Sequence, residues 1–455
     1  MMQALKFYTN AENKSIPLQV LNLQEWTEFR QKLNAFQQQQ VAWQTFNANL
    51  GELICLTSAQ GHLERVIVGV QDNKYYQALA LASSKLVPGC YALENNLPAK
   101  DLLGWGTQQY KFLRYKTIEM NPRVLLLSSK LYAEVVPRVD AIFKVRDLIN
   151  TSAEDMGPKA MSDVLESLAQ AYHGKFQSIV GEALLEENFP GIYTVGRAAV
   201  QSPRLLCLDW GSAAHPLVVL VGKGVCFDSG GLDLKPAAQM RLMKKDMGGA
   251  AQVIGLAQLI MHYALPIRLK VLIPAVENTI DALAYRPGDV IRMRNGKHVE
   301  IDNTDAEGRL ILADALSYAC EHNPQLLLDF ATLTGAARVA VGTEISALFS
   351  NQMELASQLM SFGKAYNDPI WHLPLHDGYE GMLDSNIADM VNSPSSSYAG
   401  AITAALFLRR FVNEKVTWGH LDLMAYNVTS KPGRPEGGEA MSMLAVFEYL
   451  RNHFS

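Results

Sequence analysis

Four short, almost uninterrupted apolar segments constrain the fold of this chain most strongly. They lie at Leu205–Leu208, Leu217–Val221, Ile267–Ile273 and Leu326–Phe330. Strands buried on both faces have this composition, because both sets of their side chains face the core. Helical patterns lie between and after these segments, at Gly248–Tyr263, Leu310–His322 and Gly400–Val412. The alternation predicts an α/β domain in which helices flank a mixed β-sheet.

Residues 1–135 predict a smaller α/β domain of their own. Strand-like and helical patterns occur there at Leu53–Leu56, Val66–Val70, Tyr75–Lys85, Ala99–Phe112 and Val124–Leu127. A further helical pattern starts near residue 139 and ends at turn-forming residues 151–158, so we expect residues 136–160 to link the domains by a helix. Residues 161–455 then form the larger domain. A length of 455 residues also favours two domains.

The composition excludes several classes of protein. Hydrophobic residues make up 49% and charged residues 19%, which indicates a globular protein. The net charge of −5 argues against nucleic-acid binding as the main role, and residues 1–135 hold only 13 Lys and Arg against 10 Asp and Glu. No apolar run is long enough for a membrane span, and residues 1–7 lack the apolar core of a secretory signal. Five scattered cysteines without a C-x-x-C pair suggest a reducing cytoplasm and no thiolate zinc site.

Two carboxylates and a guanidinium recur with a spacing of two residues at Asp305, Glu307 and Arg309. In an extended backbone these three side chains would leave on the same side. The motif lies between a strand-like segment, His298–Ile301, and the helical pattern from Leu310, which is where open α/β sheets place their sites. The alternative is a capping turn with a surface ion pair.

A second charged cluster follows the strand-like segment Leu217–Val221. It contains Lys223, Asp228, Lys235 and Asp246. Since Lys223 and Asp228 are five residues apart, the chain must bend between them or just after, at Gly224 or at the Gly230–Gly231 pair. Asp246 has a simpler alternative role as the N-cap of the helix that follows. The glycine pattern matches neither nucleotide-binding loop.

If the two clusters meet, four carboxylates share one cavity: Asp228, Asp246, Asp305 and Glu307. Such an arrangement is costly unless cations compensate it, and two divalent cations would do so. Lys223 could ligate a metal only when neutral; chemistry alone favours an ammonium that pairs with a carboxylate. No histidine lies in the clusters, and oxygen ligands suit zinc, manganese or magnesium. We expect His372, His376 and His420 to be structural, and Cys226 to be a small buried hydrophobe.

Several motifs in the same order resemble those of the leucyl (cytosol) aminopeptidase family of metallopeptidases. The resemblance runs from about residue 139 to the C-terminus and is weak to absent over residues 1–135. It is carried by Gly222–Gly224, Phe227–Gly231, Asp246–Ala251, Asn303–Leu310 and Ala331–Ala336.

The resemblance implies a role for each matching residue. Asp228 and Glu307 would share two divalent metals, with Asp305 completing the shell of one metal and Lys223 and Asp246 that of the other. Lys235 and Arg309 would be the catalytic residues. The pocket for the first substrate side chain would be lined by Met243, Thr332, Leu333 and Gly335.

The resemblance also implies an activity: hydrolysis of the N-terminal residue of short peptides by a water that two metals activate. Lys235 would stabilise the oxyanion, and Arg309 would hold a bicarbonate ion. A homohexamer and a cytoplasmic location are also implied, without membrane binding and with nucleic-acid binding unlikely. The segments Leu423–Asn427 and Lys431–Glu439 depart from the usual family pattern, which leaves the side-chain preference open. Rival interpretations are a binuclear phosphoesterase, a DNA-binding regulator and a catalytically dead scaffold.

Overall fold

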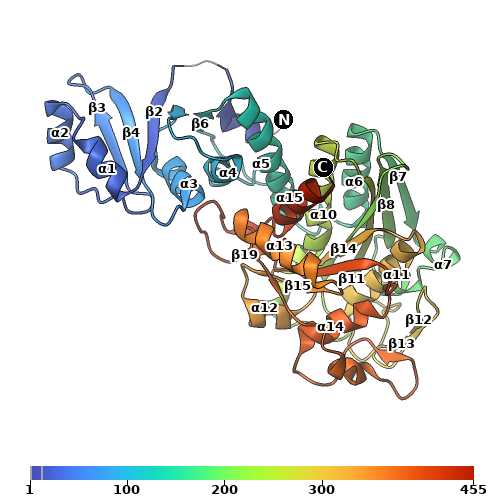
Figure 1. The fold of residues 1–455 in the computed structure, drawn as a ribbon. Helices are drawn as coiled ribbons and strands as arrows, with labels where there is room; N and C mark the ends of the chain where they lie inside the picture. The colour runs from blue at the N-terminus through green and yellow to red at the C-terminus, as the bar shows by residue number, and fades with distance from the viewer. Residues whose placement is uncertain (1–2, 12–13, 455) are drawn as a thin grey trace. The chain divides into compact units, whose positions relative to one another are not determined.

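The computed structural model describes residues 3–11 and 14–454 and divides into two compact units (Figure 1). Unit 1 runs to Phe143 and includes Val428–Glu436, whereas unit 2 comprises Lys144–Asn427 and Gly437–Ser455. The division falls within the long helix α5 (Ser129–Asn150). Met1 and Met2, at the start of the segment in which no secretory core was expected, lie outside the described residues.

Unit 1 contains a six-stranded sheet in the order β1-β6-β5-β2-β4-β3. Its strand pairs are parallel except for the antiparallel pair β3–β4. The strands are β1 (Tyr8–Thr9), β2 (Ile16–Leu21), β3 (Leu53–Thr57), β4 (Leu63–Gly69), β5 (Gly89–Leu93) and β6 (Arg123–Leu126). The helices are α1 (Leu23–Arg30), α2 (Ala35–Ala42), α3 (Tyr75–Lys85) and α4 (Ala99–Thr107). The smaller α/β domain was therefore predicted correctly in kind, although α4 ends five residues before the expected Phe112.

Unit 2 is built on a nine-stranded sheet in the order β16-β15-β18-β14-β9-β11-β8-β7, with β10 also paired to β11. Both parallel and antiparallel pairs occur, so the predicted mixed sheet is confirmed. The strands are β7 (Lys175–Val180), β8 (Arg204–Trp210), β9 (Leu217–Gly222), β10 (Gly224–Asp228), β11 (Arg268–Asn278), β14 (Leu326–Ala331), β15 (Ser346–Ser350), β16 (Ile370–His372) and β18 (Thr417–Asp422). The four apolar segments correspond to β8, β9, β11 and β14.

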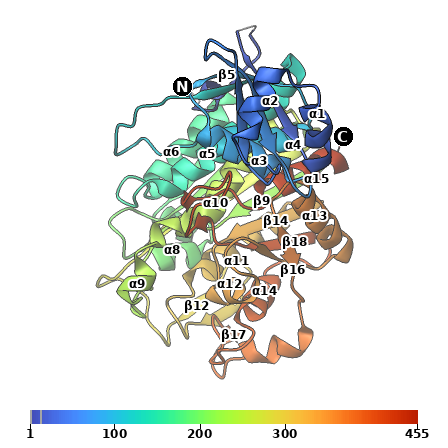
Figure 2. The same ribbon diagram turned by 90° about the vertical axis from the view of Figure 1, so that its left-hand side faces the viewer.

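Helices flank this sheet (Figure 2). They include α6 (Pro158–Ala171), α8 (Pro190–Gly196), α10 (Gly248–His262), α11 (Glu307–Glu321), α12 (Gly335–Val341), α13 (Met353–Ala365), α14 (Gly400–Arg409) and α15 (Met443–His453). Helix α10 packs on β9 and β14, and α11 packs on β9 and β11. The α11 side of the core uses alternate residues of β9, Leu217, Val219 and Val221, as expected for one face of a strand.

The glycines at the start of α10 allow the helix to approach the sheet closely. A Cβ atom at Gly249 would lie 2.0 Å from the backbone oxygen of Phe330 in β14. The missing side chain at Gly249 therefore permits this close approach of the two backbones. Within residues 3–11 and 14–454, no helix combines the length and the apolarity that a membrane crossing requires.

Candidate active site

Strand β11 determines the position of Lys223 and Asp228, which belong to the second charged cluster. Its first residues pair with β9 and its last residues, Ala275–Asn278, pair with β10. The strand is interrupted at Lys223, but the register to β11 is the same on both sides, with Val221 opposite Leu272 and Gly224 opposite Ala275. The register shifts between Val225 and Phe227, and Asp228 lies at the end of β10. The predicted departure from a straight strand is therefore a bulge between Val225 and Phe227, rather than a bend at Gly224. Asn278 donates a hydrogen bond from Nδ2 to Oδ1 of Asp228 at 2.9 Å.

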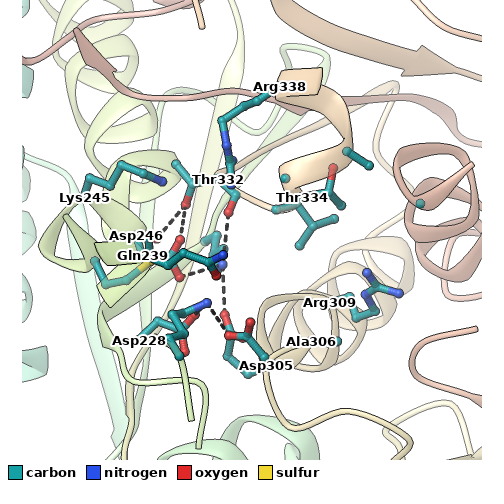
Figure 3. A pocket seen from close by; sticks show the side chains of 18 of the residues that line it. Asp228, Gln239, Lys245, Asp246, Asp305, Ala306, Arg309, Thr332, Thr334 and Arg338 are labelled. Atoms are coloured by element: carbon teal, nitrogen blue, oxygen red, sulfur yellow. Dashed lines mark hydrogen bonds and ion pairs between the residues drawn. The ribbon is translucent and has the colours of Figure 1, made fainter. Parts of the chain in front are cut away.

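The motif of Asp305, Glu307 and Arg309 does not have the extended backbone that its spacing suggested. Asp305 lies in a turn, and Glu307 is the first residue of α11, three residues before the predicted start at Leu310. In a helix, residues two apart leave about 200° apart, so Glu307 and Arg309 point in different directions. Arg309 donates from Nη1 to the backbone oxygen of Asn392 at 2.6 Å, and Figure 3 shows it well apart from Asp228. The expectation of one shared side is therefore wrong for Arg309.

Asp246 lies in the 3-10 helix Met243–Met247, and α10 begins after it with Met247 as its N-cap. The capping alternative therefore does not describe Asp246. Instead, Thr332 donates its hydroxyl to Oδ1 of Asp246 at 2.8 Å. Its other oxygen, Oδ2, lies 2.7 Å from Nζ of Lys223.

Two lysines lie among the four carboxylates. Nζ of Lys223 is 2.7 Å from Asp246 and 2.9 Å from Glu307. Nζ of Lys235 is 2.9 Å from Asp228 and also pairs with Asp305 (Figure 3). All five expected ligand residues and Lys235 are therefore gathered in one place.

Burial and mutual repulsion alter the proton affinity of these groups. Burial, followed by the charge of Asp228, raises the pKa of Glu307 to about 8 and that of Asp305 to about 6. Burial alone would lower the pKa of Lys223, but Asp246 and Glu307 outweigh it, so this pKa is raised. Burial lowers the pKa of Arg309 to about 10, which still leaves the guanidinium protonated at neutral pH.

The carboxylates fit a site for divalent cations. One oxygen from each of Asp228, Asp305 and Glu307 lies within 4.8 Å of the others. Carboxylate oxygens bind such metals at about 2.0–2.2 Å, so atoms this close can share one ion or bridge a pair. In addition, Oδ2 of Asp246 and Oε1 of Glu307 are buried, and the Lys223 ammonium is the only partner of each among the described residues.

A pocket of about 570 Å³ opens beside the charged cluster. All four residues expected to contact the first substrate side chain line it: Met243, Thr332, Leu333 and Gly335. Met424, from the segment that departs from the family pattern, also lines it. Two basic residues of the lining, Lys245 and Arg338, were not identified from the sequence. The only available signal was that Lys245 directly precedes Asp246.

The sequence also gave no indication of the residues that support the cluster. Asn278 donates to both Asp228 and the backbone oxygen of Thr304, at 2.9 and 3.1 Å. Tyr285 donates its hydroxyl to the same Thr304 oxygen at 2.6 Å. Asp233 accepts from the backbone N–H of Thr304 at 2.7 Å. These bonds fix the turn that carries Asp305.

Two of the residues expected to be structural, His420 and Cys226, lie in the interior. His420 is fully buried, and its Nδ1 lies 2.5 Å from Oδ1 of Asp329. Cys226 is a buried thiol in β10. His372 and His376 are absent from the pocket lining.

Comparison with known proteins assigns the family. Residues 143–446 match the model of the "Cytosol aminopeptidase family, catalytic domain", and residues 16–127 match "M17 aminopeptidase, N-terminal domain". The second match shows that the expectation of little resemblance in the first 135 residues was wrong.

Individual relatives agree with this assignment. Peptidase B of Pectobacterium atrosepticum is 44% identical over 302 residues, which cover 64% of this chain and 69% of the relative. A probable cytosol aminopeptidase of Chlamydia abortus is 37% identical over 386 residues, which cover 80% of this chain and 77% of the relative.

Solved structures extend the similarity to nearly the whole chain. A cytosol aminopeptidase from Coxiella burnetii has a TM-score of 0.95 and 44% identity, covering 98% of this chain and 99% of the other. The bottromycin maturation enzyme BotP in complex with Mn has a TM-score of 0.88 and 30% identity. The similarity covers 97% of this chain and 100% of the BotP chain. The chain therefore belongs to the cytosol aminopeptidase family and is a peptide hydrolase of that family.

Proposed function

We propose that this chain is a metal-dependent aminopeptidase that removes the N-terminal residue from short peptides by a two-metal mechanism. The observation that carries the proposal is the convergence of Asp228, Asp305 and Glu307, with ligand oxygens within 4.8 Å of one another. Divalent cations at such a site would polarise a carbonyl and lower the pKa of water to about 7.

Each charged residue would then have one role. Asp228 and Glu307 would share the two metals, Asp305 would complete one shell, and Lys223 and Asp246 would complete the other. Zinc and manganese are the first metals to test, followed by magnesium. The Mn complex of BotP, a relative at 30% identity, supports the choice of manganese.

Lys235 and Arg309 would act on the substrate side of the site. The Lys235 ammonium lines the pocket and would donate a hydrogen bond to the carbonyl oxygen as its negative charge develops. Arg309 cannot accept a proton, because its guanidinium stays charged. Its Nε is buried without a hydrogen-bond partner among the described residues, which supports binding of an anion such as bicarbonate there.

Three broader expectations remain proposals; the first rests on the sequence patterns, and the homohexamer rests on the family resemblance. The first is the division into residues 1–135, a linking region 136–160 and a catalytic domain 161–455. The second is a homohexamer; light scattering that reports a monomer at micromolar concentration would contradict it. The third is a cytoplasmic location.

Removal of metal tests the proposed function most directly. Chelation should abolish hydrolysis of leucine p-nitroanilide, and added Mn²⁺ or Zn²⁺ should restore it. The same preparations assayed on p-nitrophenyl phosphate separate peptidase from phosphoesterase activity. Full activity in protein shown to be free of metal would refute the metal mechanism.

A further inference from the structure

The pocket contains two basic side chains for which the proposed chemistry has no use. Lys245 belongs to the same 3-10 helix as Met243, and Arg338 belongs to α12, which begins at Gly335. Both therefore lie next to residues proposed to contact the first substrate side chain. In Figure 3, Arg338 lies beyond Thr332 as seen from Asp228 and Asp305, and Lys245 lies beside Thr332.

Lys245 is buried without a direct ion-pair partner among the described residues, although the carboxylates of Asp246 and Asp422 lie within electrostatic range. Only 2% of its surface is exposed, yet no described residue forms an ion pair or a side-chain hydrogen bond with its ammonium group. Burial of an unpaired ammonium is unfavourable, so an anion that enters the pocket would be bound strongly.

Arg338 is similarly available for an anion. Its Nη1 atom is buried and has no hydrogen-bond partner among the described residues. The carboxylates nearby are already engaged: Asp246 and Glu307 face Lys223, and Asp228 and Asp305 face Lys235. Divalent cations in the proposed positions would only add positive charge to the same cavity.

We propose that Lys245 and Arg338 bind the side-chain carboxylate of the substrate's first residue, so that this aminopeptidase prefers peptides with N-terminal Glu or Asp. The inference rests on the proposed function and adds its substrate class. A carboxylate held by a buried ammonium and a guanidinium forms charge-assisted hydrogen bonds, which are stronger than neutral ones. The remaining lining, with Leu242, Met243 and Met424, would contact the methylene groups of the substrate.

The test compares the p-nitroanilides of Glu and Gln, which have nearly the same shape and differ in charge. The metal-loaded full-length protein should cleave the Glu substrate with a kcat/KM at least about tenfold higher, the minimum expected for one hydrogen bond between charged groups. Equal or faster cleavage of the Gln substrate would overturn the inference. Cleavage of leucine p-nitroanilide in the same preparation shows whether the enzyme is active at all, so loss of all three activities would count against the proposed function instead.

Variants assign the preference to these residues. Lys245→Met and Arg338→Met should each lower the Glu-to-Gln ratio of kcat/KM by about tenfold to a hundredfold. Lys364→Met, which removes an exposed lysine near the end of α13, is the matched control and should leave the ratio unchanged. An unchanged ratio in both pocket variants would contradict the assignment, provided that cleavage of leucine p-nitroanilide and the melting temperature show folded protein.

A free C-terminal carboxylate is the competing anion. We therefore also compare Glu-Gly with Glu-Gly amide, and Leu-Gly with Leu-Gly amide. If Lys245→Met weakens only the substrates with a free C-terminus, the pair of basic residues binds the far end of a dipeptide, and the inference about the first residue is wrong. If it weakens both Glu substrates equally, the inference is supported.

Discussion

The Cβ atom that any other residue would add at Gly308 would lie 2.4 Å from Cε of Lys223. Gly308 lies in the first turn of α11, directly after Glu307, and Lys223 lies between β9 and β10. The absence of a side chain at Gly308 therefore allows Lys223 to reach Glu307 and Asp246.

Gly308→Ala should displace the Lys223 side chain and reduce both metal content and activity. Because the nearest atoms belong to a flexible side chain, Lys223 would move rather than the backbone, and the protein should remain folded. A shift of about 1 Å can cost a hundredfold in rate, so we expect kcat/KM to fall about tenfold to a hundredfold. Gly381→Ala is the control, since its Cβ would meet nothing nearer than Oδ2 of Asp384 at 3.7 Å. Wild-type metal content and activity in Gly308→Ala would contradict this account.

Glu307→Gln should lose bound metal and rate together. The substitution keeps the shape but removes the charge from a carboxylate that is 1% exposed and proposed to share both metals. Loss of a residue that only supports a metal ligand costs about tenfold to a hundredfold, so loss of a ligand should cost more. Metal analysis of the purified variant, alongside kcat on leucine p-nitroanilide, is the measurement. A variant with two bound metals and normal kcat would remove Glu307 from the ligand set.

Lys235→Ala should lower kcat and leave the metal content unchanged. If its ammonium stabilises the developing oxyanion, its removal should cost about a hundredfold to a thousandfold in kcat. Lys235→Arg should retain more activity than the alanine variant, because it keeps a positive donor. Loss of metal from Lys235→Ala would instead make Lys235 part of the metal-binding set.

Asn278→Ala should weaken metal binding without abolishing it. The amide of Asn278 orients Asp228 and the turn before Asp305, and it contacts no proposed substrate position. We expect metal affinity to fall about tenfold to a hundredfold, as for other residues that orient ligands. Titration with Mn²⁺ should restore kcat at high metal concentration. A low kcat that excess metal does not restore would show that Asn278 acts in another way.

The buried pair His420 and Asp329 should make stability depend on pH. Burial lowers the pKa of His420, but Asp329 outweighs it, so the pKa is raised. A raised pKa in the folded state stabilises the protein fully below about pH 6.5, and this stabilisation is lost as the pH rises through the folded value. Asp329→Asn should therefore lower the melting temperature most at pH 6 and progressively less at higher pH. A constant difference between pH 6 and 9 would contradict the charged pair.

The sequence predicted the sheet of unit 2 because its strands are buried on both faces and hence continuously apolar. It did not predict β10, which begins at Gly224 and ends at Asp228 and so lacks that pattern. It also placed the start of α11 at Leu310, because Glu307 and Arg309 are charged and look like loop residues. Both are buried, and hydrophobic periodicity cannot detect the burial of charged residues.

The carboxylates of the site were found through their charge and the four expected pocket residues through the family resemblance, whereas residues that neither signal marks were missed. Asp228, Asp246, Asp305 and Glu307 form an unusual number of carboxylates near predicted strand ends. Such a concentration of charge can be recognised from the amino-acid sequence alone. Asn278 and Tyr285 act through single hydrogen bonds to partners far along the chain. Arg338 follows the Thr332–Gly335 motif by one helical turn, and only the three-dimensional structure shows that it lines the same pocket.

Strand β11 packs in the hydrophobic core and also positions the residues of the candidate active site. Its side chains from Leu269 to Val276 are almost all inaccessible to solvent, and its last residue, Asn278, orients Asp228. Sliding this strand by one residue would misplace β9, β10 and Asn278 simultaneously. Thermal inactivation should therefore coincide with melting of the core, and a molecule with an intact interior but a disordered centre should be scarce.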